Sequence, residues 1–222
     1  MTRRRTGFAP EGGGILVGSG ALVLLLAAAS LWYGHEGRLL WLPALGCIWF
    51  VLVAQFFRDP ERISPTGDRF VLSPADGKII SIGEAIESPL TPPGVRVSIF
   101  MSPLNVHVNR SPMNGRITRF EHNRGKFQSA FKPAAARENE HTLIVMETNY
   151  GTIAFKQVAG FLARRIVFHP RTGDTLRAGE RVGMIRFGSR ADIFLPDTVR
   201  IGVKLGDHVT AGETIIGEFI EL

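Results

Sequence analysis

The stretch MIRFGSRADIFLP, residues 184–196, is the segment around which the rest of the chain can be organised. Apolar residues alternate with charged ones on both sides of Gly188-Ser189, so this dipeptide is predicted to lie between two β-strands. Glycine lacks a Cβ and reaches backbone conformations closed to other residues, which lets the serine hydroxyl approach the preceding carbonyl carbon. That approach is what self-cleavage requires. An ordinary strand-turn-strand contains the same dipeptide, so the other motifs must decide.

The composition limits the partners that this chain can have. Its 222 residues have room for one sizeable domain and an accessory segment. The net charge is +6, and the basic excess is spread over the whole chain. Outside residues 3–5 no run of Lys and Arg is interleaved with aromatic residues, which favours an anionic membrane surface over nucleic acid. The single cysteine, Cys47, excludes an internal disulfide and is interpreted as a small packing residue.

Two apolar runs precede the region of alternating strands. Ile15–Tyr33 and Leu39–Phe57 each contain nineteen residues without Asp, Glu, Lys or Arg. About 20 apolar residues are needed for a helix to cross a bilayer. With only a short polar link between them, the runs predict a membrane-anchoring helical hairpin at residues 1–57, followed by the main domain at 58–222.

Arginines at both ends of this segment predict its orientation. Residues 3–5 precede the first run, and Arg58 and Arg62 follow the second, so the positive-inside rule places both ends and the following domain in the cytoplasm, at the inner membrane. Two alternatives remain open. The first run could be a cleaved signal peptide, or the hairpin could lie shallow in the interface, since proline and glycine interrupt it at Gly18, Gly20, Pro43 and Gly46.

Beyond residue 62 the pattern changes to short alternating strands linked by Pro, Gly, Asn and Asp. Such strands at this spacing predict a mainly β domain, a β-sandwich or a barrel-sandwich. The expected strands are residues 71–72, 77–82, 95–100, 141–146 and 152–155.

A Gly-Asp-x-apolar-x-Ala-Gly-Glu pattern occurs twice, at residues 173–180 and 206–213. The pattern resembles the hairpin turn of lipoyl and biotinyl carrier domains and of related barrel-sandwich hybrid folds. It lacks the lysine that a carrier modifies at the tip of the hairpin. We therefore interpret both copies as structural hairpins that bracket Gly188-Ser189.

Three segments together resemble the phosphatidylserine decarboxylase proenzymes in their short, membrane-anchored form. They are SPADGK at 73–78, FMSPLNVHVNRSPMNG at 100–115 and the string at 184–196, and the resemblance covers about residues 56–222. It implies cleavage between Gly188 and Ser189, giving a large chain, 1–188, and a small chain, 189–222. It also implies that Ser189 becomes a pyruvoyl cofactor, which converts phosphatidylserine to phosphatidylethanolamine and CO2 through a Schiff base.

The reaction explains why these residue types belong together. A serine hydroxyl is a weak nucleophile near neutral pH and needs a base, commonly a histidine oriented by a carboxylate. Asp76, His107 and Ser189 could supply this arrangement from three distant segments, and we expect them to be the catalytic residues. Many bacterial relatives carry a second histidine where this chain has Arg110, so His107 is expected to serve alone.

Substrate and metal binding are less marked in the sequence. Two polar segments also carry the resemblance, at residues 122–127 and 137–141, although solvated loops would look the same. The remaining histidines share no close metal-ligand spacing, so no metal is expected. The candidates for binding the substrate phosphate, chosen by charge alone, are Arg124, Lys126, Arg164 and Arg165.

The expected partners are phosphatidylserine in the membrane and the two chains of the same precursor, with no nucleic acid and with homo-oligomerisation left open. Two alternative functions remain at this point. One is decarboxylation of a different serine phospholipid, such as an archaeal-type ether lipid, because its head group is the same. The other is a non-catalytic, membrane-tethered carrier or binding module, for which the chain would stay intact.

Overall fold

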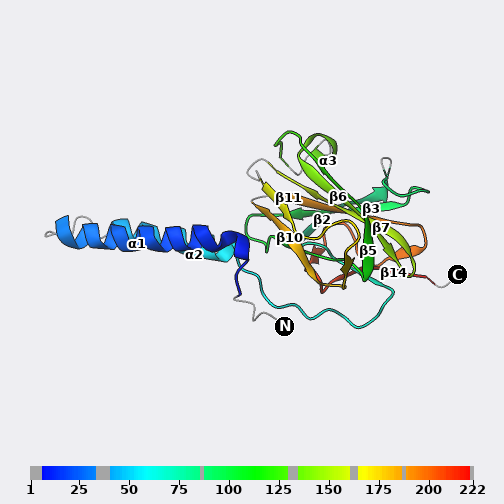
Figure 1. The fold of residues 1–222 in the computed structure, drawn as a ribbon, viewed down its shortest axis with the longest axis horizontal. Coiled ribbons are helices and arrows are strands. Elements are labelled where there is room, and N and C mark those ends of the chain that lie inside the picture. The colour runs from blue at the N-terminus through cyan, green and yellow to red at the C-terminus, as the bar shows by residue number, and fades with distance from the viewer. Residues whose placement is uncertain are drawn as a thin grey trace. The chain divides into compact units, whose positions relative to one another are not determined.

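The structure is a computed structural model, and it describes residues 7–33, 41–85, 88–129, 135–160, 165–186 and 189–220. The chain divides into two compact units, residues 1–61 and 62–222. The first is helical and the second is built from β-strands (Figure 1).

The helical unit is a pair of antiparallel helices. A short 3-10 turn at Pro10–Gly12 leads into α1, Gly13–Tyr33, and α2 spans Trp41–Phe56. The Trp49 indole N–H donates to the Ser19 hydroxyl over 3.2 Å, and a Cβ on Gly46 would meet the Leu26 side chain at 3.1 Å. Glycine therefore lets the two helices approach closely.

The two ends of this helical pair are also joined. The Ala9 amide donates to the Phe57 carbonyl over 2.7 Å, and the Asp59 amide donates to the Gly7 carbonyl over 2.7 Å. The chain therefore enters and leaves the pair at one end, as a hairpin requires.

The two helices differ in reach. The 3-10 turn and α1 form one apolar helical segment of 24 residues, Pro10–Tyr33, which is long enough to cross a membrane, whereas α2 has 16 residues. At 1.5 Å per residue α2 extends about 24 Å, which is shorter than the roughly 30 Å hydrocarbon core. The long apolar helix can anchor the protein in a membrane.

The described residues of the β unit form three antiparallel sheets, which confirms the predicted mainly β fold. The largest sheet curls into a half-barrel (Figure 1). It has eight strands in the order β13-β2-β3-β11-β7-β6-β5-β9. The two smaller sheets have the orders β1-β14-β12 and β4-β10-β8. The strands are β1 (Phe70–Leu72), β2 (Gly77–Glu84), β3 (Val95–Met101), β4 (Val108–Arg110), β5 (Gly115–Asn123), β6 (His141–Thr148), β7 (Gly151–Val158), β8 (Arg165–Phe168), β9 (Thr175–Leu176), β10 (Arg181–Arg186), β11 (Ser189–Leu195), β12 (Val199–Ile201), β13 (His208–Val209) and β14 (Ile215–Phe219). One short helix, α3 (Ala135–Glu138), interrupts them.

The strand β11 lies at the centre of the large sheet, between β3 and β7, and all seven of its residues are buried. Ala191, Ile193 and Leu195 point into the main hydrophobic core. Arg190 and Asp192 point to the opposite face, where they are buried as well. Both faces of β11 are therefore buried, and the alternation of apolar and charged residues does not separate core from solvent. The buried charges are tolerated because Arg190 and Asp192 pair with each other.

The repeated motifs cover the two edges of the large sheet. The first copy supplies β9 and the second supplies β13, the two outermost strands. Gly179 and Gly212 both have a φ of +73°, and a Cβ on Gly212 would lie 3.2 Å from the Gly179 Cα. The two copies therefore touch, which brings the edges of the curled sheet together and protects them from pairing with other chains. Both copies are therefore structural turns, but the prediction that they are hairpins is wrong, because β9 and β10, and likewise β13 and β14, belong to different sheets and do not pair with each other.

We expect Gly77→Ala to destabilise the protein strongly. A Cβ at Gly77 would lie 2.2 Å from the carbonyl oxygen of Phe100, a backbone atom of the paired strand that cannot rotate away. Overpacking of this kind costs about 1–3 kcal/mol, and we expect the upper end. Gly83→Ala is the control, because it lies in the same strand and its Cβ would meet nothing within 4 Å. Thermal unfolding of both variants tests this, and equal melting temperatures would contradict it.

Candidate active site

Ser189 is the first residue of β11 and is fully buried. Its strand pairing places it opposite Met101 of β3, and its hydroxyl donates to the Met101 sulfur over 3.2 Å. The preceding strand, β10, ends at Arg186 in a different sheet, so the chain changes sheets just before Ser189. The predicted flanking strands are confirmed, whereas Gly188 lies outside the described residues. A thioether accepts a hydrogen bond only weakly and is no base, so this contact does not activate the serine.

His107 lies immediately before β4 and is also fully buried. Its Nδ1 is 3.0 Å from the carbonyl oxygen of Asn105. Because a carbonyl can only accept, Nδ1 carries the hydrogen, and in the neutral ring the lone pair is on Nε2. The Ile185 amide donates to the His107 carbonyl over 3.2 Å. The end of β10 that leads to Ser189 is therefore the end beside His107.

Asp76 precedes β2 on a segment that also lies against β4. The Arg110 amide donates to the Pro74 carbonyl over 3.0 Å, which fixes this segment beside the strand that follows His107. One carboxylate oxygen of Asp76 accepts from Arg62 and the other from the Ala211 amide, both over 2.8 Å. The structure thus gathers the three predicted segments around β4. The hydrogen bonds described for their side chains go to other groups, so a catalytic triad remains a prediction.

Arg62 holds the predicted site residue Asp76, a contact that the sequence did not reveal. Its guanidinium bridges Asp76, over 2.8 Å, and Glu213, over 3.2 Å, and Glu213 also accepts from the Ile63 amide over 3.1 Å. Arg62 and Asp76 are mostly buried, with 14% and 13% of their side chains exposed. In the sequence Arg62 was only one of the charges that follow an apolar run. Its partners are 14 and 151 residues away, and no local pattern connects them.

Arg110 is buried and structural. Its guanidinium donates to the Gly179 carbonyl over 3.1 Å, and its Cδ would lie 2.9 Å from a Cβ on Gly212. Arg110 therefore helps to hold the two repeated turns together. That His107 serves alone stays a prediction.

A chain of buried amides also reaches Met101, and sequence reasoning missed it. The Thr142 hydroxyl donates to the side-chain oxygen Oε1 of Gln157 over 2.8 Å, and the side-chain Nε2 of Gln157 donates to Oδ1 of Asn109 over 2.8 Å. The Asn109 amide in turn lies 3.3 Å from the Pro74 carbonyl and 3.8 Å from the Met101 sulfur. These side chains fix the surroundings of the sulfur that holds Ser189, and they come from three separate strands.

The phosphate candidates occupy two different places. Lys126 is exposed and pairs with Glu138 over 3.0 Å, and its hydrogen bond and charge hold the pKa of Glu138 below the ordinary value. Arg124 lies nearby and is exposed. Arg165 begins β8 and lies opposite Arg186 in the strand pairing of β8 with β10. Arg186 is three residues before Ser189. Arg164 lies outside the described residues.

The two polar segments that carried the resemblance pack against each other. The Lys126 amide donates to the Glu138 carbonyl over 2.7 Å, and the Glu140 amide donates to the Lys126 carbonyl over 3.0 Å. The buried Asn139 amide donates to the carbonyls of Gln128, over 2.8 Å, and Ala159, over 2.7 Å. These segments are therefore not free loops, because backbone and side-chain bonds fix them to each other.

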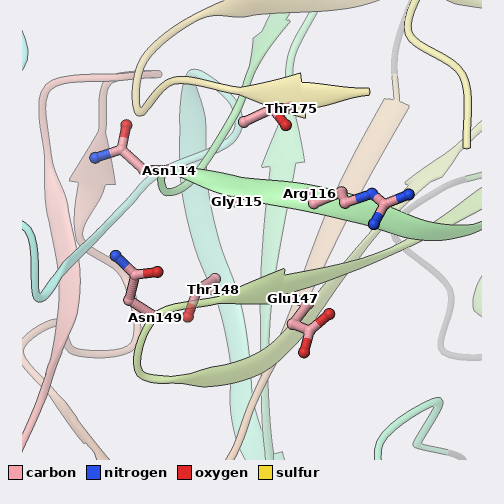
Figure 2. A pocket seen from close by; sticks show the side chains of 7 residues that line it. All are labelled: Asn114, Gly115, Arg116, Glu147, Thr148, Asn149 and Thr175. Carbon is pink, nitrogen blue, oxygen red and sulfur yellow. The ribbon is translucent and has the colours of Figure 1, made fainter. Parts of the chain in front are cut away.

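A polar pocket of about 410 Å³ lies elsewhere, beside the start of β5 and the turn that follows β6 (Figure 2). It is lined by Asn114, Gly115, Arg116, Glu147, Thr148, Asn149 and Thr175, and none of these is a predicted site residue. Asn114 accepts from the Ala178 amide over 2.9 Å, which places the pocket at the end of β4 and β10 away from His107. Within the described ranges no group of three or more His, Cys, Asp or Glu could hold a metal ion.

The chain is similar to known proteins over most of its length. A family model described as phosphatidylserine decarboxylase matches residues 49–217. Similar curated proteins include the phosphatidylserine decarboxylase proenzyme of Magnetococcus marinus, which is 46% identical over 88% of this chain and 88% of its own length. Those of Pelobacter propionicus and Geobacter sulfurreducens are each 42% identical over 98% of this chain and 99% of their own length.

The chain therefore belongs to the phosphatidylserine decarboxylase family, a family of carboxy-lyases. The name proenzyme describes precursors that are processed into separate chains, and the family name describes action on a phospholipid. These comparisons favour an enzyme and give no support to the non-catalytic carrier module or to an ether lipid as substrate.

Proposed function

We propose that this protein cuts itself between Gly188 and Ser189, converts Ser189 into a pyruvoyl group, and uses that group to decarboxylate phosphatidylserine to phosphatidylethanolamine. The observation that carries this proposal is the buried Ser189 at the start of a central strand, on the chain segment that passes His107, in a member of this family.

Self-cleavage begins with the serine hydroxyl. Ser189 Oγ attacks the carbonyl carbon of Gly188 while its proton passes to a base, for which the lone pair on His107 Nε2 is our candidate. The C–N bond then breaks, which leaves an ester between Gly188 and the Ser189 oxygen and a free amine on residue 189. The hydroxyl must first leave the Met101 sulfur, because that contact directs its proton away from any base.

The second stage removes the large chain. A base takes the α-proton of residue 189, and the bond between its Cβ and the ester oxygen breaks, so residues 1–188 leave with a carboxylate at Gly188. The dehydroalanine that remains takes up one water and releases ammonia, which gives a ketone at position 189. No oxidant is needed, because elimination and hydrolysis account for all atoms and electrons.

The surroundings of Ser189 fit a pyruvoyl group that is formed from this residue inside the folded protein. The residue is fully buried against the thioether of Met101, which excludes water from a reactive carbonyl. Once formed, the pyruvoyl group supplies a ketone that captures the substrate amine and an amide carbonyl that takes up the electrons left by CO2. His107 can then return a proton to the substrate carbon, because a protonated imidazole is a general acid.

Asp76 is proposed to support these steps from a fixed position. Its carboxylate is fixed by Arg62 and the Ala211 amide, on a segment that the Arg110 amide binds through the Pro74 carbonyl, beside the strand that follows His107. Among the phosphate candidates, Arg165 has the strongest support, because its strand pairs with the end of β10 that leads to Ser189. Arginine binds phosphate with two parallel hydrogen bonds, which suits recognition of a phospholipid head group.

The helical unit is proposed to place the enzyme at its substrate. Residues 1–57 form the anchor and residues 58–222 the catalytic domain, on the cytoplasmic side of the inner membrane by the distribution of arginines. The apolar α1 and the joined ends of the hairpin support this arrangement.

Removal of the anchor should separate membrane binding from self-processing. A protein that starts at Asp59 should be recovered in the soluble fraction and should still cut itself, because Asp76, His107 and Ser189 all lie beyond it. Ultracentrifugation with a denaturing gel measures both properties. If the shortened protein sediments with membranes as fully as the parent, residues 1–57 are not the main anchor.

Turnover tests the substrate and the cofactor together. With phosphatidylserine in mixed micelles, the processed protein should release CO2 and form phosphatidylethanolamine without added pyridoxal phosphate or metal. Borohydride added during turnover should stop the reaction and leave a covalent adduct on the small chain, which intact mass detects. Turnover that resists both borohydride and hydroxylamine would exclude the pyruvoyl mechanism. A preference for an ether-linked serine lipid over the diacyl lipid would support the alternative substrate.

A further inference from the structure

A buried charged cluster lies beside Ser189 on the opposite face of β11. Arg190 Nε donates to Asp192 Oδ1 over 2.6 Å, and Arg190 Nη2 donates to the Ser98 hydroxyl of β3 over 2.8 Å. The side chains of Arg190 and Asp192 are 3% and 0% exposed, and Ser98 is fully buried. We call Arg190, Asp192 and Ser98 the Arg190 cluster.

Stability alone is a poor reason for this cluster. Taking two charges out of water costs several kcal/mol for each ion, and apolar residues of similar volume commonly give an equally stable protein. The other carboxylate oxygen of Asp192 is buried and accepts no hydrogen bond from the described part of the chain, so the cost is not fully offset. The same face also carries an apolar cluster around Phe194, which an apolar pair could extend. The cluster is therefore better explained by the groups that it holds in place than by a contribution to the stability of the fold.

Processing removes the attachments of residue 189 itself. In the precursor Ser189 is held by its hydroxyl bond to Met101 and by its place in the ladder with β3. After conversion the hydroxyl is gone, and so is the backbone N–H, because its nitrogen has left as ammonia. The residue is then a chain terminus, and termini fray unless other contacts hold them.

We propose that the Arg190 cluster positions the new terminus of the small chain, with Arg190 as a positioning residue. Arg190 is the first residue of the small chain whose side chain survives processing. Its backbone pairs with Phe100 on one side and Val158 on the other, and its guanidinium is fastened to its own strand and to β3. These contacts hold residue 189 in register after its hydroxyl and its backbone N–H have been lost. The proposal rests on the proposed function, because it concerns the cleaved form.

The test compares the cluster in cleaved and uncleaved protein. The main variant is Arg190→Met/Asp192→Val, which removes both charges together and so leaves no buried unpaired ion. Arg119→Met/Glu121→Val is the matched control, since these residues form an Arg–carboxylate pair at the same spacing on β5 but are exposed. Each change is also made in Ser189→Ala protein, where the chain stays continuous. Hydrogen–deuterium exchange of the peptide at 190–195 is followed in all forms.

We expect the cluster variant to process fully and, once cleaved, to exchange at least about ten-fold faster in this peptide than the cleaved parent. In the Ser189→Ala background the same change should alter exchange less than about two-fold. Turnover should fall about ten-fold through kcat, with KM little changed, whereas the control pair should match the parent throughout. Equal acceleration in cleaved and uncleaved protein would show a merely structural role and overturn the proposal, as would unchanged exchange after cleavage.

A milder variant keeps the test decisive if the double variant does not process. Ser98→Ala leaves the ion pair and removes only the bond to β3, and the cleaved form should again exchange faster while the uncleaved form does not. If both forms of Ser98→Ala match their parents, the proposal is wrong. Failure of the proposed function looks different, because the parent protein itself would then remain uncut.

Discussion

Replacement of Ser189 by alanine should leave the protein as one uncut chain of 222 residues. The parent should separate into residues 1–188 and a small chain of 34 residues (222 minus 188) whose terminus is blocked to Edman degradation. The expected loss of processing is complete, because the attacking oxygen is removed and the Met101 sulfur beside it cannot replace it. A denaturing gel with intact mass measures the outcome.

Ser111→Ala is the matched control for this experiment. Ser111 is also fully buried, and its hydroxyl also lies near a methionine sulfur, Met146 at 3.9 Å, but it donates to the Met113 carbonyl over 2.8 Å. This variant should process like the parent. The idea fails if the parent stays intact after long incubation, or if its small chain carries a free serine amine.

Replacement of His107 by alanine should slow processing by about 10²–10⁴-fold, the usual contribution of a general base. The reason is that Nδ1 is committed to the Asn105 carbonyl, so the ring presents a basic Nε2 in a buried site next to the segment that leads to Ser189. The rate of appearance of the small chain in a time course measures the effect. His122→Ala is the control, because His122 is exposed and pairs with Glu140.

A second experiment separates maturation from turnover at His107. Residues 1–188 carrying His107→Ala can be combined with a small chain given its pyruvoyl group by other means, and CO2 release can then be assayed. We expect turnover to fall by a similar factor if His107 returns the proton to the substrate carbon. Full turnover in this assembly would exclude that role, and processing of His107→Ala at the parent rate would exclude the role in maturation.

Local patterns in the sequence were sufficient for the class of fold and for the elements around the reactive bond. The alternation at 184–196 predicted strands on both sides of Gly188, and β10 and β11 confirm them. Strand periodicity depends on neighbours two residues apart, so it can be recognised without knowledge of the sheet. The two apolar runs and the two glycine-rich repeats are equally local, and α1, α2 and the paired turns follow from them.

The tertiary structure alone decided which of these residues meet. The sequence showed only that charged and apolar residues alternate in this segment, whereas the central position of β11 buries both faces and makes Arg190 and Asp192 an internal pair. Arg62 counted in the sequence only as a positive charge, yet it holds Asp76 and Glu213.

The physical reason is the distance along the chain over which each effect acts. Periodicity, turn formation and apolar runs involve residues that are neighbours along the chain, so the β class, the apolar helices and the motifs of the family can be recognised from the sequence. A buried charge is stable only beside its partner, and strand order decides who that partner is. The neighbours of Asp76, Ser189 and Arg190 were therefore fixed only when strands far apart in sequence were placed side by side.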